Sequence, residues 1–347
     1  MGELLEAVRG LPPEVPKWSL RPFPPDPEGY RPTQNGREPT RFIDRVRNHT
    51  YNCAGVNLSG VKGKIDMKKT SSHRRGKDEV REYHSPANGI FFRVGKWLAS
   101  ETSPYQRMEI FENEFFGRVL VLDGLIQTTE RDEFFYHEML VHPALTAHPA
   151  PGEVLIIGGG DGGALREVLR HPVRKVWLVE IDDRVTSAAE KYLWLSGPLA
   201  DRRTELVIGD GDEFIRWAGR IFDVILVDSS DPVGPSAVLH QRDFYERVKG
   251  CLKPGGILAA QAGSLLHHQE TFKIKQDFQK ELFKYARFYL GPVPTYPGGT
   301  WVYNFCSDRV NPMKAPKKRP PDGLKYYNKE IHTAAFALPE FLKQTLE

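Results

Sequence analysis

Short apolar runs alternate with segments of helical spacing along residues 153–308. The runs are rich in Val, Ile and Leu, as buried strands are, and the segments between them place apolar residues three or four positions apart. We predict strands at 153–157, 175–179, 206–208, 223–227 and 257–261, helices at 164–170, 184–191, 213–217, 241–251 and 268–283, and a closing hairpin from 286–290 and 300–306. This order predicts an α/β fold, a doubly wound parallel sheet with helices on both faces.

The preceding part of the chain has a different pattern. Residues 89–94, 105–111 and 117–128 are short β-branched and aromatic runs separated by Gly, Asp and Asn. Such runs predict a small antiparallel sheet. Residues 130–147 then return to helical spacing, with apolar side chains at Phe134, Phe135, Met139 and Leu140. We expect a small β domain plus a linking helix over residues 80–150, a Rossmann-like catalytic domain over 151–310, and a C-terminal segment over 311–347 that packs on the core.

The first part of the chain is rich in proline and basic residues. Nine of the 27 prolines lie in residues 1–40, where they remove backbone donors and disfavour helix. Residues 1–85 hold 16 Lys and Arg against 11 Asp and Glu, a charge of +5, which leaves −2 for the rest of a chain whose total is +3. We expect residues 1–79 to be a poorly ordered extension. Nucleic-acid binding is an alternative for this basic arm, but no nucleic-acid-binding motif accompanies it, so we expect no nucleic-acid partner.

Composition narrows the class of protein further. Apolar residues make up 40% of the chain, yet no run approaches the roughly 18 residues that a membrane span needs, so we expect no membrane association. The N-terminus has no basic stretch followed by an apolar one, as a secretory signal would. Cys53, Cys251 and Cys306 are too few and too scattered for a disulfide framework or a zinc site. We expect a cytoplasmic protein.

A glycine-rich loop follows the first strand of the alternating region. Residues 158–163 read Gly-Gly-Gly-Asp-Gly-Gly, which satisfies G-x-G-x-x-G between a strand and a helix and predicts a nucleotide-type ligand. Asp161 within this loop would repel a pyrophosphate by about 4 kcal/mol at 4 Å and an effective dielectric of 20. The loop therefore favours a neutral or cationic nucleoside over NAD.

Acidic residues stand at the ends of the other strands. Glu180 ends the second strand, where a carboxylate commonly holds ribose hydroxyls. Asp210 ends the third and can accept from an adenine amino group, while Gly211 leaves room for the ring. Asp228 ends the fourth, with Asp231 close behind. Because ligands bind at the carboxyl ends of parallel strands, these acidic residues would line one ligand cleft, and an acidic cleft favours a cationic ligand. A metal ion is one candidate for this cation, but the usual metal-ligand spacings are absent from the sequence. A sulfonium nucleoside bound together with a polyamine is the other candidate.

Several linked motifs in residues 88–347 resemble the polyamine aminopropyltransferases, the spermidine synthases among them. The resemblance covers about three-quarters of the chain. Because many motifs occur in the same order, it is more specific than the glycine loop alone. The motifs are Ser103–Gln106, Leu122–Phe134 with Tyr136–Met139, Leu155–Gly163 with Leu165–Val168, Asp228–Pro235, Pro294–Tyr296, Tyr326–Asn328 and Ile331–Pro339.

The resemblance implies a methyltransferase-type Rossmann-like fold and a homodimer. It implies transfer of the aminopropyl group of decarboxylated S-adenosylmethionine, a co-substrate, to putrescine, giving spermidine and methylthioadenosine, with no permanent cofactor and no metal. Asp228 would be the catalytic base, and residues 229–240 would form a lid. The nucleoside would be held by Gln106, Asp161, Glu180, Asp210, Gly211 and Pro235, and the amine by Tyr136, His137, Asp161, Asp228, Ser229, Ser230, Asp231 and Tyr296.

The acceptor is the least defined part of this interpretation. Residues 298–301 place the bulky Trp301 where diamine length is read, which leaves agmatine, or spermidine as the precursor of thermospermine or spermine, as alternatives. A methyltransferase on the same fold remains the alternative enzyme class. A non-catalytic polyamine- or nucleoside-binding subunit would need a damaged catalytic set, whereas Tyr136, Asp161 and Asp228 are all present.

Overall fold

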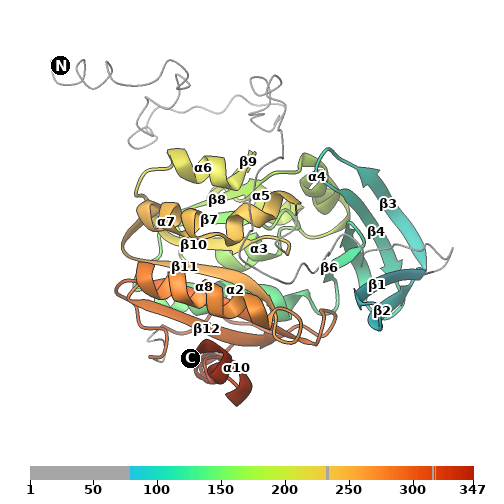
Figure 1. Cartoon of the computed structure of the whole chain (residues 1–347). Coiled ribbons are helices and arrows are strands. Elements are labelled where there is room, and N and C mark those ends of the chain that lie inside the picture. Colours follow the sequence, from blue (N-terminus) through green and yellow to red (C-terminus); the bar gives the residue numbers. More distant parts are fainter. Residues whose placement is uncertain (1–78, 232–233, 315, 317) are drawn as a thin grey trace, which may run out of the picture. The chain divides into compact units, whose positions relative to one another are not determined.

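The computed structural model describes residues 79–231, 234–314, 316 and 318–347 (Figure 1). The predicted extension, apart from its last residue, and Cys53 lie outside these residues. Within them, Cys251 and Cys306 are buried free thiols. None of the helices in the described ranges is long and apolar enough to cross a membrane.

A seven-stranded sheet forms the centre of the fold, in the order β12-β13-β11-β10-β7-β8-β9. Strands β7 to β11 pair in parallel, and β12 and β13 add an antiparallel hairpin at the β11 edge. The bounds are β7 Glu153–Gly158, β8 Lys175–Glu180, β9 Thr204–Ile208, β10 Phe222–Asp228, β11 Leu252–Ser264, β12 Tyr285–Pro292 and β13 Thr300–Ser307. The predicted α/β class and the closing hairpin are confirmed.

Alternate residues of the central strands supply the two faces of this sheet. Val154 and Ile156 of β7 join a core with the helices before and after that strand, whereas Leu155 and Ile157 join a second core on the opposite face. Because both faces are covered, β7 and β10 are apolar along nearly their whole length and buried. The carboxyl ends of these strands are therefore fixed in place by both cores.

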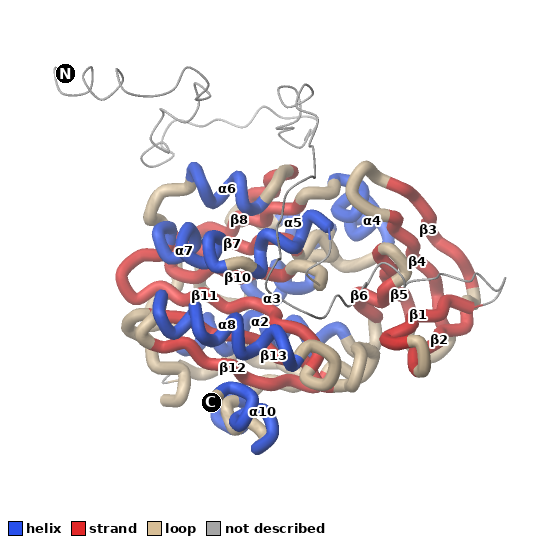
Figure 2. Tube along the Cα trace, viewed as in Figure 1, coloured by secondary structure: helices blue, strands red, loops and turns tan. Residues whose placement is uncertain are grey.

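Helices cover both faces of the sheet (Figure 2). One core contains side chains of α2, α3, α4 and α9, and the other those of α6, α7 and α8. The bounds are α2 Glu133–Ala147, α3 Gly163–Leu169, α4 Asp183–Tyr192, α5 Ser196–Ala200, α6 Gly211–Trp217, the 3₁₀ helix η5 Gly234–His240, α7 Arg242–Cys251, α8 Gln269–Leu282, α9 Lys329–Ala335 and α10 Glu340–Leu346. The C-terminal segment packs on the core through Tyr327, Ala335 and Phe336.

A small antiparallel region precedes the large sheet, as predicted (Figure 1). It consists of the hairpin β1-β2 and the four-stranded sheet β3-β4-β5-β6. The bounds are β1 Glu79–Ser85, β2 Asn88–Arg93, β3 Lys96–Thr102, β4 Arg107–Asn113, β5 Gly117–Leu122 and β6 Leu125–Thr129. Strands β1 and β3 carry several charged residues, so their pattern did not mark them as strands. The domain boundaries at 80, 150 and 310 remain our proposal.

Candidate active site

A cavity of about 760 Å³ opens at the carboxyl ends of the parallel strands. Its wall is made by the loop after β7, by the ends of β8, β9 and β10, and by residues of β1, β5, β6 and α2. The predicted site residues in this wall are Gln106, Tyr136, His137, Asp161, Glu180, Asp210, Gly211, Asp228, Ser229, Ser230, Asp231 and Tyr296. Pro235, the remaining predicted residue, belongs to η5.

The glycine loop packs directly against the end of β10. Gly158 has a φ of 78°, and a Cβ on it would stand 2.1 Å from the carbonyl oxygen of Asp228. The next residue, Gly159, donates its N–H to that same oxygen at 2.9 Å. A Cβ on Gly160 would stand 2.8 Å from the Glu180 carboxylate. The glycines therefore serve the close approach of three strand ends, because no side chain fits between them.

Glu180 is buried beneath this loop. One carboxylate oxygen accepts the Gly160 N–H at 3.1 Å, and the other accepts the Asp182 N–H at 3.0 Å. Burial raises the pKa of Glu180 to about 7, against the effect of these hydrogen bonds. Each oxygen keeps a second lone pair, so the carboxylate can still accept from a ligand hydroxyl.

Gln106 is held in the cavity wall by Asp182, a residue that the sequence analysis missed. Its side-chain amide donates to Asp182 Oδ2 at 3.1 Å, and the Ser103 hydroxyl donates to the same oxygen at 2.6 Å. The other Asp182 oxygen accepts the Arg184 N–H at the start of α4. Asp182 thus joins the segment Ser103–Gln106 to the end of β8. Its signal was its place immediately before a helix, where Asp is a common N-cap.

Asp210 and Gly211 form the start of α6. Asp210 Oδ1 caps the helix by accepting the N–H groups of Asp212 and Glu213, at 2.7 and 3.2 Å. A Cβ on Gly211 would stand 2.3 Å from Cγ2 of Ile157, which explains the glycine. The cap therefore orients the Asp210 carboxylate at the cavity wall.

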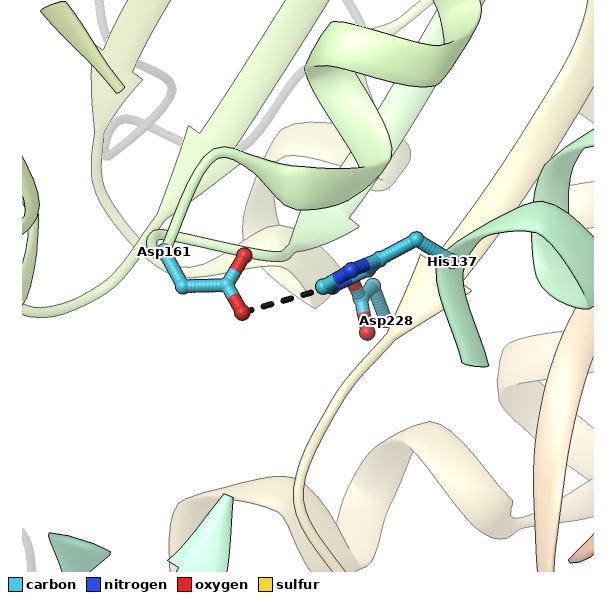
Figure 3. A group of neighbouring side chains, drawn as sticks. All are labelled: His137, Asp161 and Asp228. Carbon is cyan, nitrogen blue, oxygen red and sulfur yellow. Dashed lines mark ion pairs between the residues drawn. The ribbon is translucent and has the colours of Figure 1, made fainter. Parts of the chain in front are cut away.

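His137, Asp161 and Asp228 lie close together in the cavity wall (Figure 3). One ligand-type atom of each lies within 4.8 Å of the other two. His137 Nε2 is 3.3 Å from Asp161 Oδ2, and His137 Nδ1 is 2.7 Å from Glu133 Oε2. Glu133 was missed, although its position four residues before His137 on a predicted helix was the available signal.

This trio also has the composition of a metal site, so its protonation matters. Burial opposes the charged imidazole, but Asp161 and Glu133 together hold the pKa of His137 well above its ordinary value. An imidazolium donates from both nitrogens and has no lone pair for a metal ion. The arrangement therefore favours a cation beside the two carboxylates.

Asp228 is held by its neighbour across the cavity. The Tyr136 hydroxyl donates to Asp228 Oδ1 at 2.8 Å, whereas Oδ2 is buried with no hydrogen-bond partner among the described residues. Burial, then the nearby Asp161 charge, raises the pKa of Asp228 to about 6. A buried carboxylate oxygen without a partner is unfavourable, which makes it a candidate for binding a ligand N–H group.

The chain after Asp228 is held by Gln261 of β11. The Gln261 amide donates to the carbonyl oxygens of Ser229 and Ser230 at 3.0 and 3.2 Å. Its own oxygen accepts the indole N–H of Trp301 at 3.2 Å. Trp301 therefore helps to hold the first residues of the segment 229–240, which was predicted to form a lid.

The ring of Tyr296 packs near the rings of Tyr136 and Trp301. Its ring centroid lies 5.7 Å from that of Tyr136 and 4.7 Å from that of Trp301. Its hydroxyl donates to the carbonyl oxygen of Gln127 at the small-sheet side of the cavity. Tyr296 thus lines the cavity and also joins the two parts of the fold.

Sequence comparison identifies the group of proteins to which this geometry belongs. The profile of the spermine/spermidine synthase domain matches residues 133–315, and that of the spermidine synthase tetramerisation domain matches residues 80–130. The polyamine aminopropyltransferase of Moorella thermoacetica is 43% identical over 269 residues, which cover 77% of this chain and 95% of that protein. The chain belongs to the polyamine aminopropyltransferase family. A Thermoanaerobacter aminopropyltransferase is 44% identical over 258 residues, 74% of this chain and 93% of that protein.

Solved aminopropyltransferase structures share the fold. A spermidine synthase in complex with the transition-state analogue AdoDATO superposes with a TM-score of 0.73 at 41% identity, covering 81% of this chain and 98% of that one. The Thermotoga maritima spermidine synthase gives 0.71 at 40% identity, with coverage of 81% and 98%. The methyltransferase-type Rossmann-like fold implied by the motifs is thereby confirmed.

Proposed function

We propose that the protein transfers the aminopropyl group of decarboxylated S-adenosylmethionine to putrescine, giving spermidine and methylthioadenosine. Family membership supports the reaction class. The cavity supports the donor, since Glu180 offers acceptors for ribose hydroxyls and Asp210 stands at the next strand end for the adenine amino group. The putrescine assignment rests on the resemblance of residues 294–296 and 326–328 to putrescine users.

Asp161 fits the charge of this donor. Decarboxylated S-adenosylmethionine carries a sulfonium and an ammonium but no carboxylate, whereas ordinary S-adenosylmethionine carries a carboxylate as well. Asp161 lines the cavity, and one of its oxygens accepts the Gly163 N–H at 2.8 Å, which fixes its orientation. A carboxylate pair at 4 Å costs about 4 kcal/mol at an effective dielectric of 20, nearly a thousandfold in affinity. Asp161 would therefore favour the decarboxylated donor.

The reaction requires a neutral amine. An alkylammonium pKa near 10.4 leaves the free amine about 4.6 kcal/mol less favourable at pH 7. Asp228 would accept a proton from the bound ammonium while the Tyr136 hydroxyl fixes the carboxylate. The amine lone pair then forms a bond to the aminopropyl methylene that is attached to sulfur, the bond between that carbon and sulfur breaks, and its electron pair stays on sulfur as neutral methylthioadenosine. Exclusion of water would strengthen each of these contacts.

One observation carries this proposal: Asp228 has an unpartnered buried oxygen beside Asp161 and His137, in a cavity whose strand-end side chains are acidic. The test is a product assay with decarboxylated S-adenosylmethionine and a panel of putrescine, agmatine and spermidine. We expect spermidine and methylthioadenosine in equal amounts, fastest with putrescine. A faster reaction with agmatine or spermidine would replace the acceptor, and S-adenosylhomocysteine formed from ordinary S-adenosylmethionine would replace the reaction.

We also propose that the protein forms a homodimer, as the resemblance implies, and that it is cytoplasmic, as its few scattered cysteines indicate. The match of residues 80–130 to a domain named for tetramerisation supports self-association. Light scattering on the purified protein measures the number of chains, and a tetramer would replace the dimer.

A further inference from the structure

Helix α8 carries a buried lysine that faces the large sheet. Lys275 is only 4% exposed, and its side-chain nitrogen donates to Nδ1 of His240 at 3.0 Å and to the carbonyl oxygen of Ala262 at 3.2 Å. Ala262 belongs to β11, and His240 is the last residue of η5. One nitrogen atom therefore joins three separate elements. Lysine is almost never fully buried unless it is paired, so this position calls for a role.

The direction of these hydrogen bonds fixes the form of His240. A lysine ammonium only donates, so His240 Nδ1 must accept and carries no proton. Burial, then the charge of Lys275, lowers the pKa of His240 to about 3, which leaves a neutral ring with its proton on Nε2. That nitrogen lies 3.3 Å from the carbonyl oxygen of Ser230 and 3.4 Å from the hydroxyl oxygen of Ser229. His240 thus donates to the chain that directly follows Asp228.

The two residues after Asp228 are held from two sides. Gln261 of β11 donates to the carbonyl oxygens of both Ser229 and Ser230, and His240 reaches the same Ser230 oxygen from η5. Asp228 is the last residue of β10, so a displacement of these two serines would move the end of that strand. The orientation of the Asp228 carboxylate therefore depends on both supports.

Stability does not explain a lysine at this position. Burial lowers the pKa of Lys275 to about 8, although the charge of Asp231 opposes this effect, so the side chain is still mostly charged at pH 7. Burial of a charge is costly, and replacing buried ionic groups by apolar side chains of similar volume is often neutral or stabilising. The hydrogen bond to His240, in contrast, requires a donor at this point.

We propose that Lys275 is a positioning residue for Asp228: it fixes His240, which in turn holds the chain at Ser229 and Ser230. This inference rests on the proposed aminopropyl transfer, in which Asp228 is the base. Lys275 should therefore affect the rate of the reaction. It should not affect binding of the nucleoside, whose proposed contacts come from the loop after β7 and from the ends of β8 and β9.

The test replaces Lys275 by methionine, which keeps the length of the side chain but removes the charge and the donor. In K275M, we expect kcat with putrescine to fall about tenfold, because the base is displaced, while calorimetry gives a Kd for methylthioadenosine within about twofold of wild type. The Tm should equal or exceed that of wild type, since a buried charge is lost. K280M is the matched control and should keep the wild-type kcat, because Lys280 is exposed on the same helix.

Variants of His240 test the route by which Lys275 acts. A glutamine amide offers one acceptor and one donor, as the neutral ring does, so H240Q should keep kcat within about threefold of wild type. H240F removes both groups and should lose about as much as K275M. The double variant K275M/H240F should lose no more than either single variant, because both changes interrupt the same route. If K275M lowers the Tm, the comparison of H240Q with H240F decides, since both keep Lys275.

Three results would overturn the inference. They are a wild-type kcat in K275M, a double variant whose loss is the product of the two single losses, and an equal loss of kcat and of methylthioadenosine binding, which would indicate damage to the whole site. If wild-type protein releases no methylthioadenosine with any amine, the proposed function fails, and the inference fails with it.

Discussion

The Tyr136 hydroxyl donates a 2.8 Å hydrogen bond to Asp228 Oδ1 and leaves the second oxygen of that carboxylate buried and unpartnered. Tyr136 comes from α2 and Asp228 from the end of β10, so one bond connects the linking helix to the central strand of the catalytic sheet. It holds the carboxylate in one orientation, in which Oδ2 is the atom left for a substrate.

Asp228→Asn tests the role of that carboxylate. The amide keeps the size of the side chain and can still accept from Tyr136, but it cannot take a proton from an ammonium. We expect kcat to fall about 10²-fold, as for loss of a general base, while calorimetry shows methylthioadenosine binding within about threefold of wild type. Turnover at the wild-type rate would remove Asp228 from the reaction.

The pH dependence of the reaction tests the link between Tyr136 and Asp228. Burial and Asp161 raise the pKa of Asp228 to about 6, and the Tyr136 hydrogen bond opposes this rise. In the proposed reaction the ionised carboxylate is the active form, so kcat/KM should decline as the pH falls through about 6. Tyr136→Phe removes the opposing hydrogen bond, so its decline should begin at a higher pH. Protonation of the amine substrate affects both enzymes equally. If kcat/KM falls at the same pH in wild type and in Tyr136→Phe, the hydrogen bond does not influence the pKa of Asp228.

Donor selection is tested by Asp161→Asn. Loss of the carboxylate removes both the attraction for the donor ammonium and the repulsion of a donor carboxylate. We expect KM for decarboxylated S-adenosylmethionine to rise, and the affinity for ordinary S-adenosylmethionine relative to that for the decarboxylated donor to increase about tenfold or more. Asp277→Asn is the matched control, since Asp277 is exposed on α8 and pairs with Lys273. An unchanged ratio of the two affinities would show that Asp161 does not discriminate.

Stability toward acid should depend on His171. Its Nε2 lies 2.9 Å from Nδ1 of His142, whose other nitrogen is 3.1 Å from Glu167. Burial, then His142, lowers the pKa of His171 to about 3. The unfolded chain therefore binds a proton that the folded protein rejects between about pH 6.5 and 3, so stability falls as the pH drops through this window. His171→Gln should be less stable at pH 7, and its Tm should fall less between pH 7 and 5; parallel Tm curves would refute the assignment.

Removal of residues 1–78 tests whether the basic arm contributes to the reaction. Among the described residues, the first in the cavity wall is Glu82 of β1, which pairs with β2. We expect kcat and KM for putrescine to remain within about threefold of the full chain. A further cut to residue 86, which also removes β1, should raise the putrescine KM. Loss of activity in the shorter deletion would show that the arm takes part in folding or catalysis.

The parts of the site that could be predicted are those that lie at strand ends. Glu180, Asp210 and Asp228 each follow an apolar run, and parallel strands place such residues at one edge of a sheet. The presence of Glu82 and His267 in the cavity wall could not be predicted in this way. They come from a charged strand and from a turn after β11, and only the packing of the small sheet against the large one brings them together.

Gly158 cannot gain even a methyl group without meeting the carbonyl oxygen of Asp228. The glycine loop and the strand that ends in Asp228 are therefore constrained to vary together. New ligand preferences in this scaffold should consequently arise in parts of the cavity wall without this constraint, such as β1.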